Sequence, residues 1–210
     1  MSLLCDCMND ILTFLGGLKH EINLVYGKAG SGKTTLALQA ALALARENKK
    51  ILFLDTEGGF NVERFQQMAG EQWTELLDKI VVMRMKSFFE QYDCIRNIMP
   101  LASKFSLVIV DTLGHWYRQE LQKDATATNK IMDRQLHLLF ELSRKVPVLL
   151  TNQVSADITN NRVASVGGNM VLKWCQRVIE LEKDPRTMIM HKPEEKKQSF
   201  DIINSGLVLR

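Results

Sequence analysis

Short apolar runs alternate with helical patterns along most of this 210-residue chain. Continuous apolar runs of this length are typical of strands that are buried on both faces of a parallel sheet. The segments between them carry apolar residues at helical spacing or are rich in alanine and leucine. We predict strands over 22–26, 51–54, 80–83, 107–110 and 148–150, and helices over 34–46, 61–69, 88–102 and 128–145. This alternation predicts right-handed crossovers and an α/β fold with a mostly parallel central sheet.

The pattern changes after Gln153. Residues 154–168 are polar and contain two asparagines and two glycines, which predicts a mobile loop. Short strands are expected beyond it, at 177–182, 187–190 and 199–203, with turns between them. These strands predict a C-terminal antiparallel extension on one edge of the sheet.

Composition narrows the function classes only a little. The length suits one domain, and a hydrophobic fraction of 46% is ordinary for a globular protein. A net charge of +3 does not by itself point to nucleic acid. Cys5 and Cys7 form an isolated C-x-C, so reduced thiols are favoured over a zinc site. No apolar run approaches the roughly 20 residues that span a bilayer, so we expect no membrane partner and a cytoplasmic, nucleoid-associated protein.

A glycine-rich motif follows the first predicted strand and opens the first predicted helix. It fits G-x-x-x-x-G-K-[ST] at every fixed position. The glycines let backbone N–H groups turn inward as an anion cradle, and the helix N-terminus adds its positive dipole end. Lys33 can reach the β- and γ-phosphates, and the Thr34 hydroxyl can ligate Mg²⁺. The motif predicts ATP and Mg²⁺ as cofactors, bound by Gly27, Lys28, Ala29, Gly30, Ser31, Gly32, Lys33, Thr34 and Thr35.

Polar residues follow three other predicted strands. Asp111 ends the strand 107–110, where a carboxylate can hold the Mg²⁺ shell through water. Glu57 follows the strand 51–54 and can orient an attacking water, although a solvated acidic turn explains it equally well. Gln153 follows the strand 148–150 and can hydrogen-bond the γ-phosphate. Because ligands bind at the carboxyl ends of parallel strands, we predict Lys33, Glu57 and Gln153 as catalytic residues.

Taken together, these segments resemble the RecA/RadA recombinase superfamily. Residues 55–64 read D-T-E-G-G-F-N-V-E-R and resemble the family's D-T-E-G-x-F-R-P-E-R. The strand ending at Asp111, with Trp-Tyr-Arg at 116–118, resembles the Walker B strand and the x-Y-R that follows it. T-N-Q-V at 151–154 and G-G-N at 167–169 match two further family motifs. The resemblance implies a RecA-like P-loop NTPase core.

The resemblance also implies roles for particular residues. Glu57 becomes the catalytic glutamate, Gln153 the γ-phosphate sensor and Arg64 a stacking partner for adenine. Asn61 and Val62 replace the family's Arg-Pro, which is a departure close to the expected adenine pocket.

Within the superfamily the chain is short. It begins almost at the core, and no phenylalanine is followed by alanine three positions later, as the F-x-x-A polymerisation motif requires. We therefore expect residues 1–210 to form a single RecA-like ATPase core domain without an N-terminal helical DNA-binding domain, similar to the archaeal RadB paralogs. That resemblance implies a recombination accessory protein that binds ATP, single-stranded DNA and a RadA-type recombinase. It implies at most a weak DNA-linked ATPase. It leaves undecided whether the protein forms a homodimer.

Candidate DNA contacts are less specific. Arg162 lies in the predicted loop, and Lys192, Lys196 and Lys197 belong to a C-terminal basic cluster that a solvated hairpin tip explains equally well. Trp116 and Tyr117 can stack on bases, but we favour packing roles for both. Two other functions stay open: a RecA-like motor or timing ATPase of the KaiC or helicase type and, with less support, a P-loop small-molecule kinase, for which we find no arginine-rich lid.

Overall fold

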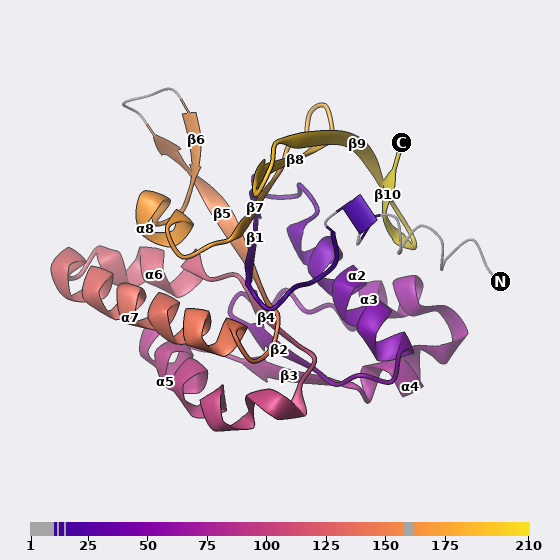
Figure 1. The fold of residues 1–210 in the computed structure, drawn as a ribbon, viewed down its shortest axis with the longest axis horizontal. Coiled ribbons are helices and arrows are strands. Elements are labelled where there is room, and N and C mark those ends of the chain that lie inside the picture. Colours follow the sequence, from indigo (N-terminus) through magenta and orange to yellow (C-terminus); the bar gives the residue numbers. More distant parts are fainter. Residues whose placement is uncertain (1–10, 12, 15, 158–161) are drawn as a thin grey trace.

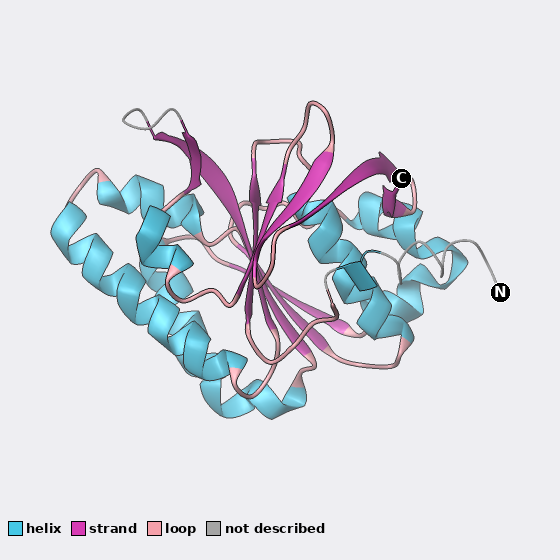
Figure 2. Ribbon diagram, turned by 45° about the horizontal axis from the view of Figure 1, so that its top comes forward, coloured by secondary structure: helices cyan, strands magenta, loops and turns pink. Residues whose placement is uncertain are grey.

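A twisted central sheet carries the fold, and helices cover it on both sides (Figure 1, Figure 2). The structure is a computed structural model and describes residues 11, 13, 14, 16–157 and 162–210. In this part of the chain the strands are β1 (Ile22–Gly27), β2 (Ile51–Asp55), β3 (Ile80–Arg84), β4 (Leu107–Asp111), β5 (Val148–Asp157), β6 (Arg162–Ser165), β7 (Arg177–Leu181), β8 (Thr187–Lys192), β9 (Lys196–Ile203) and β10 (Gly206–Leu209). The helices are α2 (Lys33–Arg46), α3 (Val62–Ala69), α4 (Trp73–Leu77), α5 (Phe88–Ile98), α6 (Gly114–Leu121), α7 (Ala125–Ser143) and α8 (Gly168–Leu172), with 3₁₀ turns η1 (Gly70–Gln72) and η2 (Met99–Lys104).

The sheet is parallel through its middle and antiparallel at one end. Its order is β10-β9-β8-β7-β1-β5-β4-β2-β3, and β6 pairs with β5 outside this path. The strands from β7 to β3 are parallel, whereas β8, β9 and β10 are antiparallel to their neighbours. This confirms the predicted α/β class, with a mostly parallel sheet and a C-terminal antiparallel extension. Because β1 lies between β5 and β7, the loop after β1 opens at the centre of the sheet edge.

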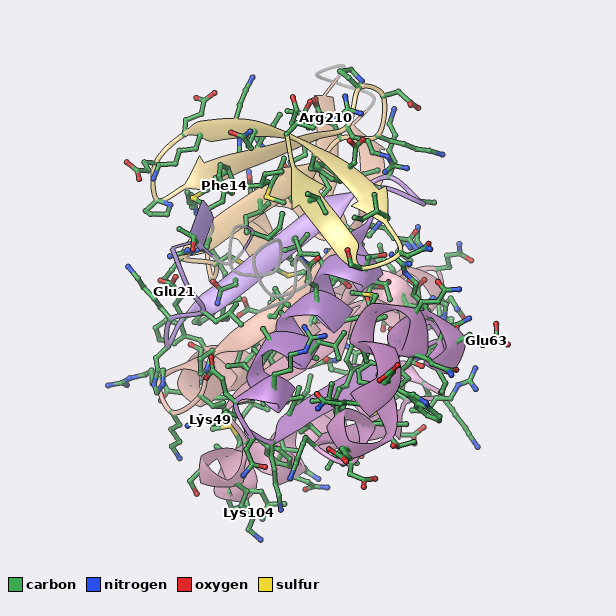
Figure 3. The ribbon with its side chains drawn as sticks, turned by 90° about the vertical axis from the view of Figure 1, so that its right-hand side faces the viewer. Phe14, Glu21, Lys49, Glu63, Lys104 and Arg210 are labelled. Carbon is green, nitrogen blue, oxygen red and sulfur yellow. The ribbon has the colours of Figure 1, made fainter. Side chains whose placement is uncertain are left out.

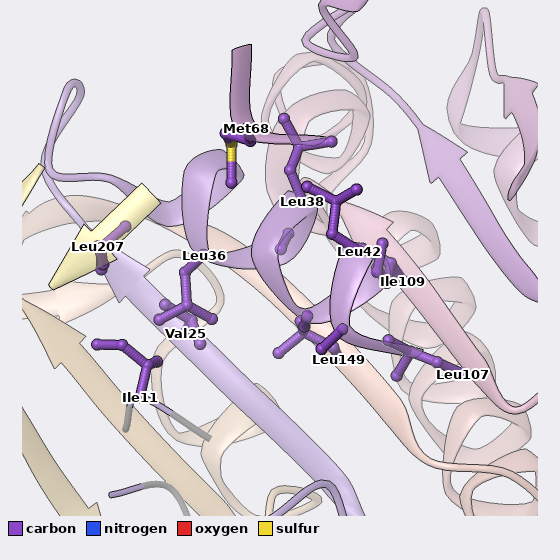
Figure 4. Close-up of a cluster of buried hydrophobic side chains, with 14 of the residues drawn as sticks. Ile11, Val25, Leu36, Leu38, Leu42, Met68, Leu107, Ile109, Leu149 and Leu207 are labelled. Carbon is purple, nitrogen blue, oxygen red and sulfur yellow. The ribbon is translucent and has the colours of Figure 1, made fainter. Parts of the chain in front are cut away.

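Two apolar layers hold the helices to the sheet. One lies under α2, α3, α4 and β10, and the other under α5, α6, α7 and α8. Figure 4 shows the first layer, where Leu36 and Leu42 of α2 lie close to Val25, Ile109 and Leu149 of the strands. Successive residues of a strand enter opposite layers. The central strands therefore read as unbroken apolar runs.

The predicted mobile loop at 154–168 is wrong in part. Strand β5 continues to Asp157 and pairs antiparallel with β6, with Val154 opposite Ser165 and Asp157 opposite Arg162. The paired segments are four residues long and their apolar residues are valine and alanine only, which is too short and too weak a pattern to predict a strand. The ribbon is therefore defined by backbone pairing that no hydrophobic pattern reveals. Residues 158–161, with Asn160 and Asn161, lie outside the described residues.

Several boundaries also differ from the predicted ones. Helix α5 ends at Ile98, and the next six residues, with a proline in the first turn, form η2. Helix α7 begins at Ala125, because the Asp124 side chain accepts a hydrogen bond from the Ala127 N–H at 2.9 Å. Its buried stripe includes Met132, Leu136, Leu139 and Leu142, whereas Ile131 and Leu138 are only half-buried.

Candidate nucleotide-binding site

The glycine-rich loop joins β1 to α2 and needs its glycines for steric reasons. Gly30 and Gly32 have φ of 74° and 108°, which is the left-handed region that side chains disfavour. At Gly27 a Cβ atom would overlap the carbonyl oxygen of Leu181 on the neighbouring strand β7. The structure thus gives a physical reason for glycine at each of the three motif positions.

Lys33 is buried inside the loop that precedes it. Its side chain is 7% exposed, and its Nζ donates hydrogen bonds to the carbonyl oxygens of Gly27 at 3.0 Å and Lys28 at 2.9 Å. Burial lowers the pKa of Lys33, while the charges of Asp111 and Glu57 act to raise it. Among the described residues, no carboxylate forms an ion pair with this ammonium group. The buried Ser31 Oγ also lacks a hydrogen-bond partner. A buried cation and an unpaired hydroxyl fit an oxyanion such as a phosphate group.

Asp111 and Thr34 meet beside this loop, as the Mg²⁺ prediction requires. The Thr34 Oγ1 donates to Asp111 Oδ2 at 2.8 Å, and the Thr151 Oγ1 donates to Asp111 Oδ1. Burial raises the pKa of Asp111, and the two hydroxyl hydrogen bonds partly oppose this effect. A hydroxyl and a carboxylate oxygen are the ligand types that Mg²⁺ prefers. The donor set at this position therefore fits the cation.

The described ranges contain no gathering of three or more His, Cys, Asp and Glu side chains suited to a metal ion. A divalent cation at Thr34 and Asp111 thus needs oxygens from a bound nucleotide or from water. None of the helices in the same ranges has the length and apolarity needed to cross a membrane.

Glu57 is fixed through one of its two carboxylate oxygens. Its Oε1 accepts hydrogen bonds from Thr112 Oγ1 at 2.7 Å and from Gln153 Nε2 at 2.9 Å. His115 Nδ1 lies 3.6 Å from the same oxygen. Gln153 in turn accepts a hydrogen bond from Arg118 Nη2 at 2.8 Å. The structure therefore joins two of the predicted catalytic residues directly. It also places Gln153 within β5, whereas we predicted it beyond the strand.

Sequence reasoning missed the residues that support this arrangement. Asp55 Oδ1 accepts from the N–H groups of Gly58 at 2.7 Å and Gly59 at 2.9 Å, which shapes the turn that carries Glu57. An aspartate followed by two glycines is a turn signal that could have suggested this role. Thr112 and Thr151 stand within or beside the quoted motifs, but their hydrogen bonds depend on which strands are neighbours. No local sequence signal gives that information.

Arg64 lies at the N-terminal end of α3 and contacts the turn between β9 and β10. Its guanidinium donates to the carbonyl oxygens of Ile203 at 2.7 Å and Asn204 at 3.1 Å. A neighbouring cavity of about 190 Å³ is lined by Gly30, Gly32, Lys33, Thr34, Thr35 and Ile202. Stacking of Arg64 on adenine stays a prediction.

The four candidate DNA contacts do not form one cluster. Lys192 Nζ donates to the carbonyl oxygen of Leu172 at 2.9 Å, at the end of α8, and Lys196 pairs with Glu194. Lys197 is exposed on β9. Arg162 begins β6, its side chain is outside the described part of the structure, and β1 and β7 separate its ribbon from β8 and β9.

The packing roles predicted for Trp116 and Tyr117 are confirmed. Tyr117 is 5% exposed, and its hydroxyl donates to Asn129 Oδ1 at 2.7 Å. Trp116 is half-buried, and its Nε1 donates to the Met85 carbonyl oxygen at 3.3 Å.

The fold and the site define a RecA-like P-loop protein. A glycine loop opens at the centre of a mostly parallel sheet, and carboxylates stand at the ends of the neighbouring strands. The model of the Rad51 family matches residues 5–204, so the chain belongs to the Rad51 family.

Relatives named DNA repair and recombination protein RadB are similar to this chain over most of their length. The protein from Methanococcoides burtonii is 34% identical over 185 residues, which cover 85% of this chain and 81% of the relative. The protein from Methanoculleus marisnigri is 35% identical over 197 residues, or 89% and 87%. The crystal structure of the RadB recombinase superposes with a TM-score of 0.77 at 31% identity and covers 94% of each chain. These matches confirm the predicted resemblance to the recombinase superfamily and its RadB paralogs.

Proposed function

We propose that this protein binds ATP and Mg²⁺ at residues 27–34 and acts in DNA repair and homologous recombination as an accessory to a RadA-type recombinase. The observation that carries the proposal is the meeting of Lys33, Thr34, Asp111, Glu57 and Gln153 at one edge of the sheet. The name of the RadB relatives, DNA repair and recombination protein, supports the recombination part. The single ATPase core and the intracellular, nucleoid-associated location belong to the same proposal.

In this proposal the residues of the loop contact different parts of the nucleotide and its Mg²⁺ ion. Its inward N–H groups and the Lys33 ammonium hold the β- and γ-phosphates, where the buried cation gains the anion that it lacks. Thr34 and Asp111 would hold Mg²⁺, Asp111 through water. When bound, the ion neutralises charge on the phosphate oxygens. Thr35 lines the adjoining cavity, and Arg64 lies where it can stack on the base.

Glu57 and Gln153 supply what hydrolysis and its detection need. Hydrogen bonds hold Glu57 through Oε1, while no hydrogen bond among the described residues occupies Oε2. Oε2 is therefore the oxygen that can orient a water and accept its proton. Gln153 lies between Glu57 and Arg118, so a change in its contact to the γ-phosphate alters both hydrogen bonds. We expect slow turnover, below about one per second, with the nucleotide acting mainly as a conformational switch.

Substitution of the loop lysine tests the nucleotide assignment. Lys33→Ala removes the buried ammonium group, so we expect no measurable ATP binding by titration calorimetry. Lys49→Ala is a matched control, because Lys49 is exposed beyond the far end of the 14-residue α2, which is about 21 Å long. Unchanged ATP affinity in the Lys33 variant would refute the assignment.

Two solution measurements test the recombination role. Light scattering of the protein with ATP, single-stranded DNA and a RadA-type recombinase should find a monomer or homodimer that joins both partners. A closed ring that ignores the recombinase would favour the alternative motor or timing ATPase. Phosphate release with and without single-stranded DNA should show weak, DNA-linked turnover. Turnover well above one per second would contradict the switch role.

A further inference from the structure

A row of lysines lies along the edge of the sheet opposite the nucleotide site. Each of five neighbouring parallel strands is preceded by at least one lysine within three residues. Five of these side chains are exposed and the sixth, Lys79, is half-buried. In spatial order from β3 to β1 the row is Lys79, Lys49 with Lys50, Lys104, Lys145 and Lys19.

Backbone hydrogen bonds show that the segments of the row are direct neighbours. The carbonyl oxygen of Lys79 accepts from Ile51 N–H at 2.9 Å, and that of Lys50 accepts from Ser106 N–H at 2.8 Å. Equivalent bonds join Pro147 to Val108 at 3.0 Å and Glu21 to Val148 at 3.2 Å. Four strand spacings of about 4.8 Å give the row a length of about 19 Å. Figure 3 shows Lys49 and Lys104 at the same end of the molecule, away from Arg210.

The charges of this row are not neutralised by the residues that the structure describes. None of its six ammonium groups makes an ion pair or hydrogen bond with another described residue. The nearby Glu21 is already paired with Arg177 at 2.9 Å. Elsewhere on the surface, lysines are paired with acids, as Lys123 is with Glu120 at 2.9 Å and Lys173 is with Asp133 at 2.8 Å. The exposed acids Glu47 and Asp78 lie within two residues of lysines of the row, but their two negative charges offset only part of its six positive charges.

We propose that this lysine edge binds the phosphate backbone of duplex DNA, as a contact surface separate from the nucleotide edge. Lysine is a point charge that suits phosphates and carries no base specificity. The phenyl ring in these segments, Phe105, packs against the core. The one exposed ring of these described segments, His20, stands beside Lys19 at the end of the row, so the rest of the edge offers charge without a ring on which unstacked bases can lie. A row of about 19 Å matches five to six base-pair steps of about 3.4 Å. The choice of DNA as the bound polyanion rests on the proposed function. The unpaired positive charges of the row are observed independently of that function.

The salt dependence of duplex binding tests the proposal. The triple variant Lys49→Ala, Lys50→Ala, Lys104→Ala removes three neighbouring charges, and Lys123→Ala, Lys130→Ala, Lys173→Ala removes the same charge from exposed lysines outside the row and outside the candidate DNA contacts. Fluorescence anisotropy uses a labelled duplex of about 20 base pairs without nucleotide. Three phosphate contacts contribute a slope of about 2.7, so between about 50 and 200 mM salt the wild type should lose about 40-fold more affinity than the edge variant. The control triple should keep the wild-type slope.

The opposite outcomes are distinguishable. An unaltered slope in the edge variant, or equal losses in both triples, would overturn the surface while leaving the recombination role intact. A larger loss of single-strand affinity than of duplex affinity in the edge variant, or competition by polyglutamate at equal charge, would overturn the duplex assignment. Absence of all DNA binding in a wild type that still binds ATP would instead count against the DNA part of the proposed function. Circular dichroism checks the fold of each variant; should the edge triple unfold, Lys19→Ala with Lys145→Ala tests the other end of the row.

Discussion

Gln39 provides a sharp test of how the C-terminal extension is attached to the RecA-like core. Its side chain is 2% exposed on α2, the helix that begins at the P-loop. Its Nε2 donates to the Leu207 carbonyl oxygen at 3.0 Å, and its Oε1 accepts from the Leu207 N–H at 2.8 Å. Because β10 is the last strand of the sheet, the outward-facing backbone groups of Leu207 have no further strand to pair with. The Gln39 amide therefore makes the two backbone hydrogen bonds that a further strand would otherwise make.

Gln39→Ala leaves both backbone groups of Leu207 buried and unpaired. A buried hydrogen bond contributes about 1 kcal/mol, and an orphaned buried group costs about 1–3 kcal/mol, so we expect the free energy of unfolding to fall by about 2–4 kcal/mol. Urea unfolding followed by circular dichroism measures the change, with an unaltered m-value as the sign that only stability has changed. Gln39→Met keeps the side-chain volume. The stability that this variant loses therefore reports the missing hydrogen bonds without the cost of a cavity. A loss below about 0.5 kcal/mol in both variants, as for an ordinary surface change, would refute the reasoning.

Two further predictions concern buried ionisable groups. Burial raises the pKa of Asp111, so its ionised form disfavours the folded state, and this penalty grows as pH rises above the ordinary aspartate range. Asp111→Asn should therefore raise the nucleotide-free melting temperature more at about pH 8 than at about pH 5, and should abolish stabilisation by Mg²⁺-ATP; an unchanged melting temperature at both pH values would contradict this. Burial also raises the pKa of the Cys94 thiol to about 11 and that of Cys175 to about 12. In a Cys5→Ser, Cys7→Ser background, Ellman's reagent should label neither thiol until urea unfolds the protein, and rapid labelling at neutral pH would show that the thiols are accessible.

The parallel strands could be predicted because their burial on both faces leaves an unbroken apolar run. That signal gives Ile51–Asp55 and Leu107–Asp111 with errors of one residue at the end. It fails for the β5–β6 ribbon, whose paired segments are short and mix small apolar with polar residues, and for β10, a strand of four residues that packs one face on α2. Both elements depend on partners that are distant in the sequence. Local pattern therefore identifies the strands that form the core and misses those that are added to its edges.

The candidate site also has a part that local sequence predicts and a part that depends on distant partners. The glycine loop and the polar strand ends could be predicted because each position has a steric or chemical requirement that its own residues reveal. The contacts between them depend on sheet order and register, which place Asp55 opposite Asp111 and Val25 opposite Thr151. Only that register brings Thr112 and Gln153 to the same oxygen of Glu57.

The C-terminal extension, which the sequence suggests is an addition to the sheet edge, contacts the P-loop, α2 and α3 of the RecA-like core at three separate points. A Cβ on Gly32 would lie 2.9 Å from Ile202 Cδ1, Arg64 donates to Ile203, and Gln39 holds Leu207. These contacts make Ile202 one side of the cavity beside the P-loop. ATP affinity measured on the Gln39→Ala variant therefore separates two roles for the extension. Weaker ATP binding together with lost stability means that β10 helps to shape the cavity, whereas lost stability with unaltered affinity means that it only covers the core.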